Sequence, residues 1–254
     1  MTNQLVENKT GKYLYAVIDA LDDFNYNSCG IDDGDVYTLD HKGVKVVVSD
    51  VVNKRMRPER QHIAAHQKVL EKVMEKSTPL PVIFGTIADD HKEVEKILTH
   101  NREMCLEKLA YVADKVEMGL RVIWDVPNIF EYFVQIDSEL MEARNHFFGS
   151  SQEPSREDKM ELGRIFDRNL KAAKEEHTEH VEEILSEYCC EVKRNRPYAE
   201  RDIMNLACLV ERDAQDKFEV GVFEVAKIFD NNFGFDFNGP WAPHNFVEID
   251  LKPQ

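Results

Sequence analysis

Two histidines at helical spacing are the residues of this chain whose types and positions could best support chemistry. His62 and His66 lie four positions apart in a segment that we expect to be helical, so their imidazoles would share one face. Two imidazoles can bind one transition metal ion when a third ligand is available, and Glu59 is the nearest carboxylate. A cytosolic metal-dependent enzyme that uses His62 and His66 is therefore one interpretation. The alternative, which we favour, is that both are ordinary residues of a helix face and that His66 makes a structural hydrogen bond.

The other polar clusters give weaker chemical signals. His177 and His180 stand among glutamates that are more typical of a solvated helix face with local ion pairs. The acidic residues 32–35 lack the alternating ligands and the terminal glutamate of an EF-hand loop. The chain contains no GxSxG, HExxH or GxxxxGK[ST] motif, and no GxGxxG in a strand–turn–helix context. We therefore expect no catalytic residue, no metal and no cofactor.

Composition and charge narrow the class of protein further. The 254 residues carry 32 Lys and Arg against 48 Asp and Glu, a net charge of −16. This balance argues against nucleic acid or an anionic membrane as the main partner, because both require a basic face. The chain shows no secretory signal and no run approaching about 18 apolar residues, so we expect a cytoplasmic protein without a membrane span. Its five cysteines lack zinc-ligand spacing and are interpreted as reduced thiols.

Strands and helices alternate in the first half of the chain and would position these side chains. Runs of β-branched and aromatic residues predict strands at residues 13–18, 36–39, 44–52, 80–88 and 116–124. Two helices are expected between them, one from Pro58 to about Lys76 and one capped by Asp89 and reaching about Lys115. This order predicts an α+β fold with an antiparallel sheet, for which a ferredoxin-like arrangement fits. We place this N-terminal domain at residues 1–125.

The second half is richer in helices. A helix over residues 127–148 carries apolar residues in two rows, the second of which contains Phe130, Val134, Met141 and Phe148. We expect it to be buried between other elements. After a break at residues 149–155, Ser155 caps a long helix that could continue to Arg194, and a strand at 203–210 and one more helix follow. Residues 126–254 are thus predicted to form a smaller, helix-rich α+β domain. A scaffold in which the long helix pairs with its own copy is a further interpretation.

The C-terminal residues 239–249, GPWAPHNFVEI, form the most unusual segment of the chain. Pro240 and Pro243 fix φ and lack an N–H, so they disfavour a regular central strand around Trp241. We expect a turn here, with Trp241 folded back to fill a core. Residues 246–249 would then form the last strand and close a sheet.

This segment resembles GPWPPYSFV, the C-terminal signature of the gas vesicle accessory family GvpF/GvpL, with Ala242 in place of a proline and His244 in place of a tyrosine. The segment LPVIFGT, at residues 80–86, is similar to the family's LPVRFGT, with Ile83 where an arginine is common. Residues 57–73, 117–125 and 205–212 (RPERQHIAAHQKVLEKV, EMGLRVIWD and NLACLVER) also resemble family segments. All five occur in the family's order and together span nearly the whole chain. The chain is therefore identified as a member of this family.

The resemblance implies a non-enzymatic accessory protein that acts in the assembly of gas vesicles, the organelles of buoyancy. It implies as partners the small hydrophobic shell protein GvpA or other accessory proteins, and does not distinguish the F from the L branch. An acidic protein with an exposed apolar groove or an open sheet edge could keep a hydrophobic shell subunit from aggregating. Aromatic side chains often anchor interfaces, so the candidate partner-binding or structural residues are Trp241, Phe246 and Phe130, together with His66. The two apolar rows of residues 127–148 are candidate contacts as well.

Overall fold

The computed structural model describes residues 10–21, 30–52, 55–149, 154–247, 249 and 251. Its contacts divide the chain into two compact units. The first combines the N-terminal part, up to Glu117, with the C-terminal segment from Pro240, and the second comprises Met118–Gly239. The C-terminal segment thus packs with the beginning of the chain. The division into domains 1–125 and 126–254 stays a prediction.

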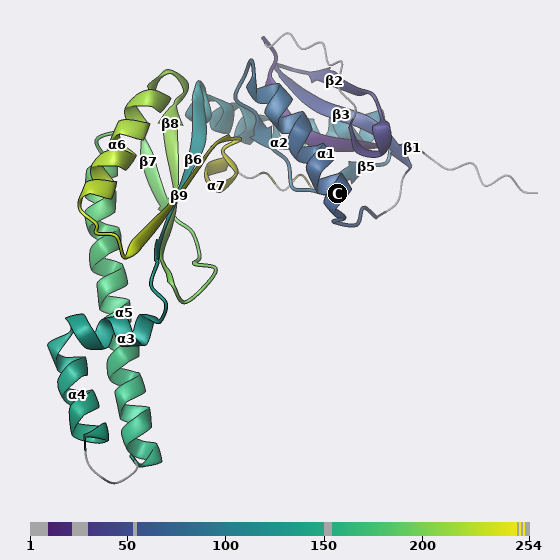
Figure 1. Ribbon diagram of the computed structural model, residues 1–254. Helices are drawn as coiled ribbons and strands as arrows, with labels where there is room; N and C mark the ends of the chain where they lie inside the picture. Colours follow the sequence, from purple (N-terminus) through teal and green to yellow (C-terminus); the bar gives the residue numbers. More distant parts are fainter. Residues whose placement is uncertain are drawn as a thin grey trace, which may run out of the picture. The chain divides into compact units, whose positions relative to one another are not determined.

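The first unit is built on an antiparallel sheet (Figure 1). Its strands are β1 (Thr10–Asp19), β2 (Val36–His41), β3 (Val44–Val52), β4 (Leu80–Pro81) and β5 (Ile87–Ala88), in the order β2-β3-β1-β4 with β5 also paired to β1. Every side chain from Tyr13 to Ile18 is fully buried. Such a continuous buried run is typical of a strand that is covered on both faces, which explains the central position of β1.

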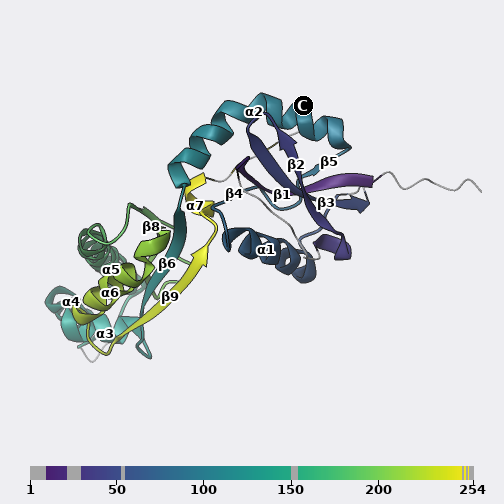
Figure 2. The ribbon, with the colours of Figure 1, turned by 90° about the horizontal axis from the view of Figure 1, so that it is seen from above.

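Two helices pack against this sheet, α1 (Arg60–Met74) and α2 (His91–Val112), and both contact β1 (Figure 2). Asp90, rather than the predicted Asp89, caps α2, because its carboxylate accepts a hydrogen bond from the backbone N–H of Glu93 at 2.9 Å. The prediction of one strand over residues 80–88 is also wrong. The chain turns between β4 and β5, where Gly85 adopts φ +89°, a left-handed conformation that glycine tolerates best.

The second unit has a sheet of its own, in the order β7-β8-β6-β9. The strands are β6 (Lys115–Trp124), β7 (Glu191–Arg194), β8 (Asp202–Glu211) and β9 (Phe233–Trp241). The helices α5 (Arg156–Leu185) and α6 (Gln215–Lys227) contact β8 and bury apolar side chains such as Val181 and Phe218. Short 3-10 turns lie at Ile31–Asp33 in the first unit and at Arg212–Ala214 in the second.

The predicted α+β fold, with a helix-rich second part, is confirmed.

The single helix predicted over residues 127–148 is instead two helices, α3 (Ile129–Ile136) and α4 (Ser138–Phe148). Asp137 separates them in an extended conformation, and its carboxylate accepts a hydrogen bond from the backbone N–H of Leu140 at 2.8 Å. Aspartate is a strong N-cap residue, so this position favours a new helix start over continuation. The α4 helix then packs against the first part of α5 as a helical hairpin (Figure 1).

The long helix α5 begins as predicted but ends earlier. Ser155 forms a capping box with Asp158 at its start. The helix stops at Leu185 instead of continuing to Arg194, because residues 191–194 form β7 and pair antiparallel with β8. Pairing with a neighbouring strand here overrides the helical pattern of the sequence. The guanidinium of Arg194 forms ion pairs with Glu175 and Glu182 of α5, each at 2.6 Å. These ion pairs hold β7 against the helix.

The C-terminal segment differs from its prediction in two ways. Residues up to Trp241 belong to β9 instead of forming a turn, and β9 lies at the edge of its sheet, where a proline such as Pro240 is tolerated. Phe246 and Val247 belong to a short helix, α7 (His244–Val247), instead of a closing strand. Ile249 forms a parallel bridge to Val82, the residue that follows β4.

Candidate functional site

His66 lies in a buried aromatic cluster. Only 6% of the residue is exposed, and its Nδ1 lies 2.9 Å from the hydroxyl of Tyr13. The rings of Tyr13, Tyr15 and Phe84 surround the imidazole at centroid distances of 5.5–5.7 Å. The backbone N–H of Gly85 donates to the Tyr13 hydroxyl at 3.1 Å, which leaves the Tyr13 proton available for His66. Burial, and secondarily the neighbouring His244, lowers the pKa of His66 to about 4, so its imidazole is neutral at physiological pH.

His62 has a separate set of partners. Its Nε2 lies 3.1 Å from Asp32 Oδ1, and its Nδ1 lies 3.3 Å from the carbonyl oxygen of Arg57. Both histidines are thus held by different groups in the first unit. Among the residues that the structure describes, no three His, Cys, Asp or Glu side chains are arranged to hold a metal ion. The geometry gives no support to a metal-dependent enzyme that uses His62 and His66.

His177 also serves packing. Its ring lies 5.2 Å from that of Phe229 and 5.5 Å from that of Phe233, measured between centroids. Burial lowers its pKa, which favours the neutral imidazole among these aromatic rings.

The segment that carries the C-terminal resemblance packs into the first unit. Ala242 is fully buried, Phe246 is 9% exposed, and Trp241 is half-buried at the end of β9. The carboxylate of Glu117, itself 6% exposed, accepts hydrogen bonds from the backbone N–H and the side-chain amide of Asn245 at 2.8 and 2.6 Å. The C-terminal segment is therefore an integral part of the first unit. A partner contact through Trp241 or Phe246 stays a prediction.

Phe130 joins an aromatic cluster inside the second unit. It is half-buried, and its ring lies 5.3 Å from that of Phe166 on α5. Phe133 lies between Phe166 and Trp124, at centroid distances of 5.8 and 5.3 Å. These contacts attach α3 to the long helix and to the sheet. Phe130 thus has a packing role in the structure, and a partner-binding role stays a prediction.

The second apolar row that the sequence places on residues 127–148 is not buried along its whole length. Val134 is 7% exposed, but Met141 and Phe148 are 42% and 43% exposed. The break at Asp137 interrupts the helical periodicity, so the row on α3 does not continue on the buried side of α4. The prediction that both sides are covered is therefore wrong for α4.

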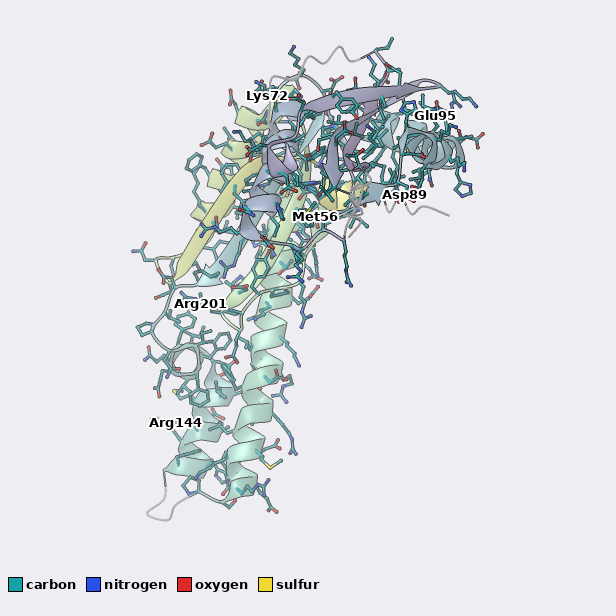
Figure 3. All side chains as sticks on the ribbon, turned by 90° about the vertical axis from the view of Figure 1, so that its right-hand side faces the viewer. Met56, Lys72, Asp89, Glu95, Arg144 and Arg201 are labelled. Atoms are coloured by element: carbon teal, nitrogen blue, oxygen red, sulfur yellow. The ribbon has the colours of Figure 1, made fainter. Side chains whose placement is uncertain are left out.

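Several helices of the second unit carry large apolar side chains that are exposed. Figure 3 shows the side chains of the second unit, with Arg144 of α4 labelled. We define the hairpin surface as the four large apolar residues of α3, α4 and α5 that are at least 42% exposed: Ile136, Met141, Phe148 and Met160. Val220 and Phe223 are also exposed, on α6. Ile136, Met141 and Phe148 belong to the apolar rows of residues 127–148 that the sequence offered as candidate contacts. Met160, Val220 and Phe223 were not among the candidates.

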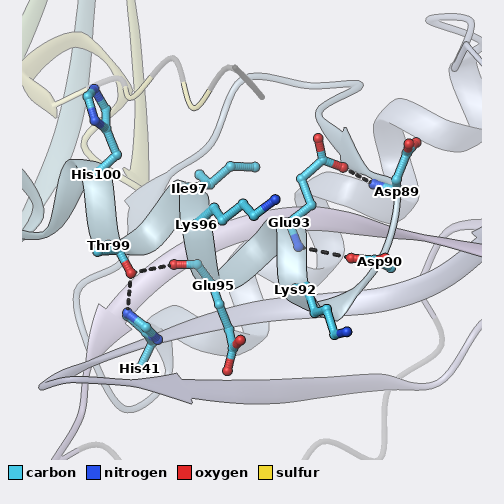
Figure 4. A pocket seen from close by; sticks show the side chains of 10 residues that line it. All are labelled: His41, Asp89, Asp90, Lys92, Glu93, Glu95, Lys96, Ile97, Thr99 and His100. Atoms are coloured by element: carbon cyan, nitrogen blue, oxygen red, sulfur yellow. Dashed lines mark hydrogen bonds between the residues drawn. The ribbon is translucent and has the colours of Figure 1, made fainter.

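A hollow of about 970 Å³ lies in the first unit beside α2 (Figure 4). Its polar groups largely bond to one another. The hydroxyl of Thr99 lies 2.7 Å from His41 Nε2 and donates to the carbonyl oxygen of Glu95, also at 2.7 Å. Asp90 caps the helix. Lysines and acidic residues alternate along the remaining wall, so no convergent set of donors or ligands results.

Comparisons with known proteins give a consistent result. The family model described as Gas vesicle synthesis protein GvpL/GvpF matches residues 11–248. The chain is 24% identical to Gas vesicle protein F of Haloferax mediterranei over 243 residues, which cover 94% of each protein. It is also 24% identical over 259 residues to Gas vesicle protein L1 of Halobacterium salinarum, covering 93% of this chain and 90% of that protein.

A solved structure shows the same fold. The crystal structure of GvpF from Anabaena superposes with a TM-score of 0.84 at 24% sequence identity and covers 95% of this chain and 99% of that one. Within the described ranges, helices with the length and apolar character of a membrane span are absent. The match of residues 11–248 extends over both units, and the chain therefore belongs to the Gas vesicle synthesis protein GvpL/GvpF family.

Proposed function

We propose that this protein acts in the cytoplasm as a non-enzymatic accessory factor of gas vesicle assembly, and that it binds the small hydrophobic shell protein GvpA or another gas vesicle accessory protein. Membership of the GvpL/GvpF family supports the gas vesicle role. The observation that carries the binding proposal is the exposed hairpin surface. Met141 and Phe148 of this surface are both exposed and lie on one side of α4, and neighbouring exposed apolar side chains are typical of sites that bind a partner.

The α4 helix shows how this surface is presented. Leu140 is fully buried and holds the helix in the second unit, whereas the adjacent Met141 faces solvent. Met141 and Phe148 are seven residues apart and therefore lie on the same side of the helix. A methionine adapts its shape to a partner, and a phenylalanine supplies a large apolar contact area. Together they would form a contact surface for a hydrophobic segment of a shell subunit.

Polar groups beside this surface are already paired with one another. Arg168 of α5 forms an ion pair with Glu139 of α4, and the side-chain amide of Asn169 donates to Asp137 Oδ2 at 3.1 Å. These contacts hold α4 against α5, so a partner would meet a preorganised apolar surface. The net charge of −16 would keep a complex with a hydrophobic partner in solution.

The residues chosen from the sequence enter this proposal in different ways. Trp241 is a second candidate contact, because its ring is only half-buried. Phe246 and His66 would support the first unit from inside, and Phe130 would hold α3 in place beneath the hairpin surface.

Co-expression with the cognate shell protein tests the proposal. The wild-type protein should keep the shell protein soluble and co-purify with it, and the double variant Met141→Ser/Phe148→Ser should retain its fold by circular dichroism but co-purify at least several-fold less. Ile63→Ser is the matched control, since Ile63 is 48% exposed on α1, far from this surface in sequence.

Two results would contradict parts of the proposal. Undiminished co-purification of the double variant would exclude the hairpin surface as the contact. Failure of the wild-type protein to capture either the shell protein or any other gas vesicle protein would refute the binding role. A stoichiometric metal in the purified protein would instead favour the enzymatic alternative at His62 and His66.

A further inference from the structure

The loop of residues 195–201 connects β7 to β8 in the second unit and is held near both of its ends (Figure 1). At its start, the backbone N–H of Asn195 donates to the carbonyl oxygen of Asn205 at 2.7 Å. Near its end, the ammonium group of Lys174 donates to the carbonyl oxygen of Glu200 at 2.6 Å. The loop is therefore attached both to β8 and to α5.

Asp202 organises the middle of this loop. Its fully buried carboxylate accepts the backbone N–H groups of Tyr198 and Ala199 at 2.7 and 3.0 Å. Its own backbone N–H donates to the carbonyl oxygen of Ala199 at 3.1 Å. Pro197, which precedes Tyr198, has a fixed φ. A loop with so few free torsions loses little conformational entropy when a partner binds to it.

This rigid loop presents one large aromatic ring to solvent. Tyr198 is 80% exposed, more than any other aromatic residue that the structure describes. The guanidinium carbon of Arg121 lies over the ring, 5.7 Å from its centroid, so the ring is supported from one side while it stays largely uncovered. An exposed tyrosine on a fixed backbone offers a large contact area at a low entropic cost, and tyrosines of this kind often anchor protein interfaces.

The charge around the loop is opposite to that of the chain. Residues 193–201 contain four basic residues and one acidic residue, whereas the whole chain carries a net charge of −16. Arg194 and Arg201 form ion pairs within the protein. The exposed Arg196 has no carboxylate partner among the residues that the structure describes. A guanidinium that is free to bind a carboxylate thus stands two residues before the exposed tyrosine.

We propose that Arg196 and Tyr198 form a docking surface for an acidic segment of a partner protein, in which a carboxylate stands next to an apolar side chain. The carboxylate would pair with the guanidinium of Arg196, and the apolar side chain would cover the ring of Tyr198. One unpaired cation is too few for nucleic acid or an anionic membrane, which require an extended basic face. This docking surface is separate from the hairpin surface, and it does not depend on the contact proposed for a hydrophobic shell subunit.

Fluorescence anisotropy tests the proposal with two labelled synthetic peptides of equal length, one made of glutamate and phenylalanine and the other of lysine and phenylalanine. The full-length protein should bind the glutamate peptide at least about tenfold more tightly than the lysine peptide at low salt, against the sign of its net charge. Arg196→Ser and Tyr198→Ser should each weaken this binding by at least about fivefold. Arg60→Ser is the matched control, because Arg60 is an exposed arginine at the start of α1.

Hydrogen exchange measures the rigidity of the loop independently of any peptide. The amides of Tyr198 and Ala199 should exchange at least about tenfold more slowly than those of an unfolded chain, because both donate to the buried carboxylate. Tyr198→Ser changes only the exposed side chain, so it should retain this protection and the circular dichroism spectrum of the wild-type protein. A weaker binding of this variant would then reflect the lost ring.

The proposal is overturned if the lysine peptide binds as tightly as the glutamate peptide, if neither peptide binds, or if Arg196→Ser and Tyr198→Ser bind like Arg60→Ser. Unprotected amides at Tyr198 and Ala199 in the wild-type protein would also contradict it. A dimer that light scattering detects and that Tyr198→Ser dissociates would assign the surface to a second copy of this chain, and would likewise overturn the proposal.

Discussion

Glu117 and Asn245 share two hydrogen bonds through one carboxylate, although 128 residues separate them in the chain. The carboxylate is almost fully buried, and a buried charge is costly unless it is hydrogen-bonded. The two donors of Asn245 therefore offset the cost of burying Glu117, and Glu117 in turn holds the C-terminal segment against the start of β6. The C-terminal segment that carries the family resemblance is therefore held in place by hydrogen bonds to a buried carboxylate.

Removal of this contact should destabilise the protein. We expect Glu117→Ala to lower the free energy of unfolding by about 2 kcal/mol, because both donors of Asn245 lose their acceptor. Asn245→Ala should lower it by about 1 kcal/mol, because the side-chain amide is lost while the backbone N–H of residue 245 still donates to Glu117. The double variant should lose clearly less than the sum of the two losses, as measured by urea denaturation. Fully additive losses would show that the two side chains do not depend on each other.

Acidification should weaken the first unit through His66. Its pKa, lowered to about 4 by burial, lies below the unfolded value near 6.5, so the unfolded chain binds more protons between these pH values. Stability is therefore retained above pH 6.5 and should fall by roughly 2–3 kcal/mol as the pH drops to 4. His66→Gln should remove this increment in unfolding measured across pH. His62→Gln is the control on the same helix and should keep the acid sensitivity, and an equal response of both variants would contradict this assignment.

Asp202 should be the most sensitive charge of the second unit. It is fully buried, Arg121 contacts its Oδ1 at 2.6 Å, and the backbone N–H groups of Tyr198 and Ala199 donate to its Oδ2. Burial alone would raise the pKa of Asp202, but these bonds outweigh it and hold the pKa below its usual value. We expect Asp202→Asn to cost about 2–3 kcal/mol at neutral pH in thermal or urea unfolding.

The sign of the pH dependence follows from the lowered pKa of Asp202. Its contribution is complete above the unfolded pKa near 4 and is lost as the pH falls through the folded value. The difference between the wild-type protein and Asp202→Asn should therefore shrink in acid. A difference that is independent of pH would point to packing as its cause.

Two helical glycines should respond oppositely to alanine. A Cβ at Gly221 of α6 would lie 2.6 Å from the ring of Tyr188, whereas a Cβ at Gly163 of α5 would meet nothing within 4 Å. Alanine favours a helix by about 1 kcal/mol over glycine, so Gly163→Ala should stabilise the protein by up to that amount. Gly221→Ala should destabilise it by about 1–3 kcal/mol through overpacking. Unfolding midpoints that shift in the same direction would refute this reading of the Tyr188 contact.

The sequence predicted those elements whose local pattern and tertiary role agree. The apolar β-branched run at Val44–Val52 and the capping box at Ser155 both appear where they were expected. Predictions were wrong where a single polar residue or a distant strand decided the outcome. Asp137 starts a new helix because its side chain caps one, and residues 191–194 leave the helical pattern because β8 offers them backbone partners. The second of these depends on β8, a strand that begins only after the loop that follows residues 191–194.

The candidate residues were predictable only in part. The aromatic character of Trp241, Phe246 and Phe130 is visible in the sequence, but their burial depends on the surrounding elements. The exposure of Met141 and Phe148 could not be read from periodicity, because the pattern across Asp137 resembles that of one continuous buried helix.

The uninterrupted length of α5 has a mechanical consequence. Its 30 residues span about 45 Å, with α3 and α4 attached to one part and β8 and α6 to another. A helix of this kind bends little between its two sets of contacts, so it acts as a lever. A load applied to the hairpin by a bound subunit would be transmitted as torque to the sheet instead of being absorbed locally.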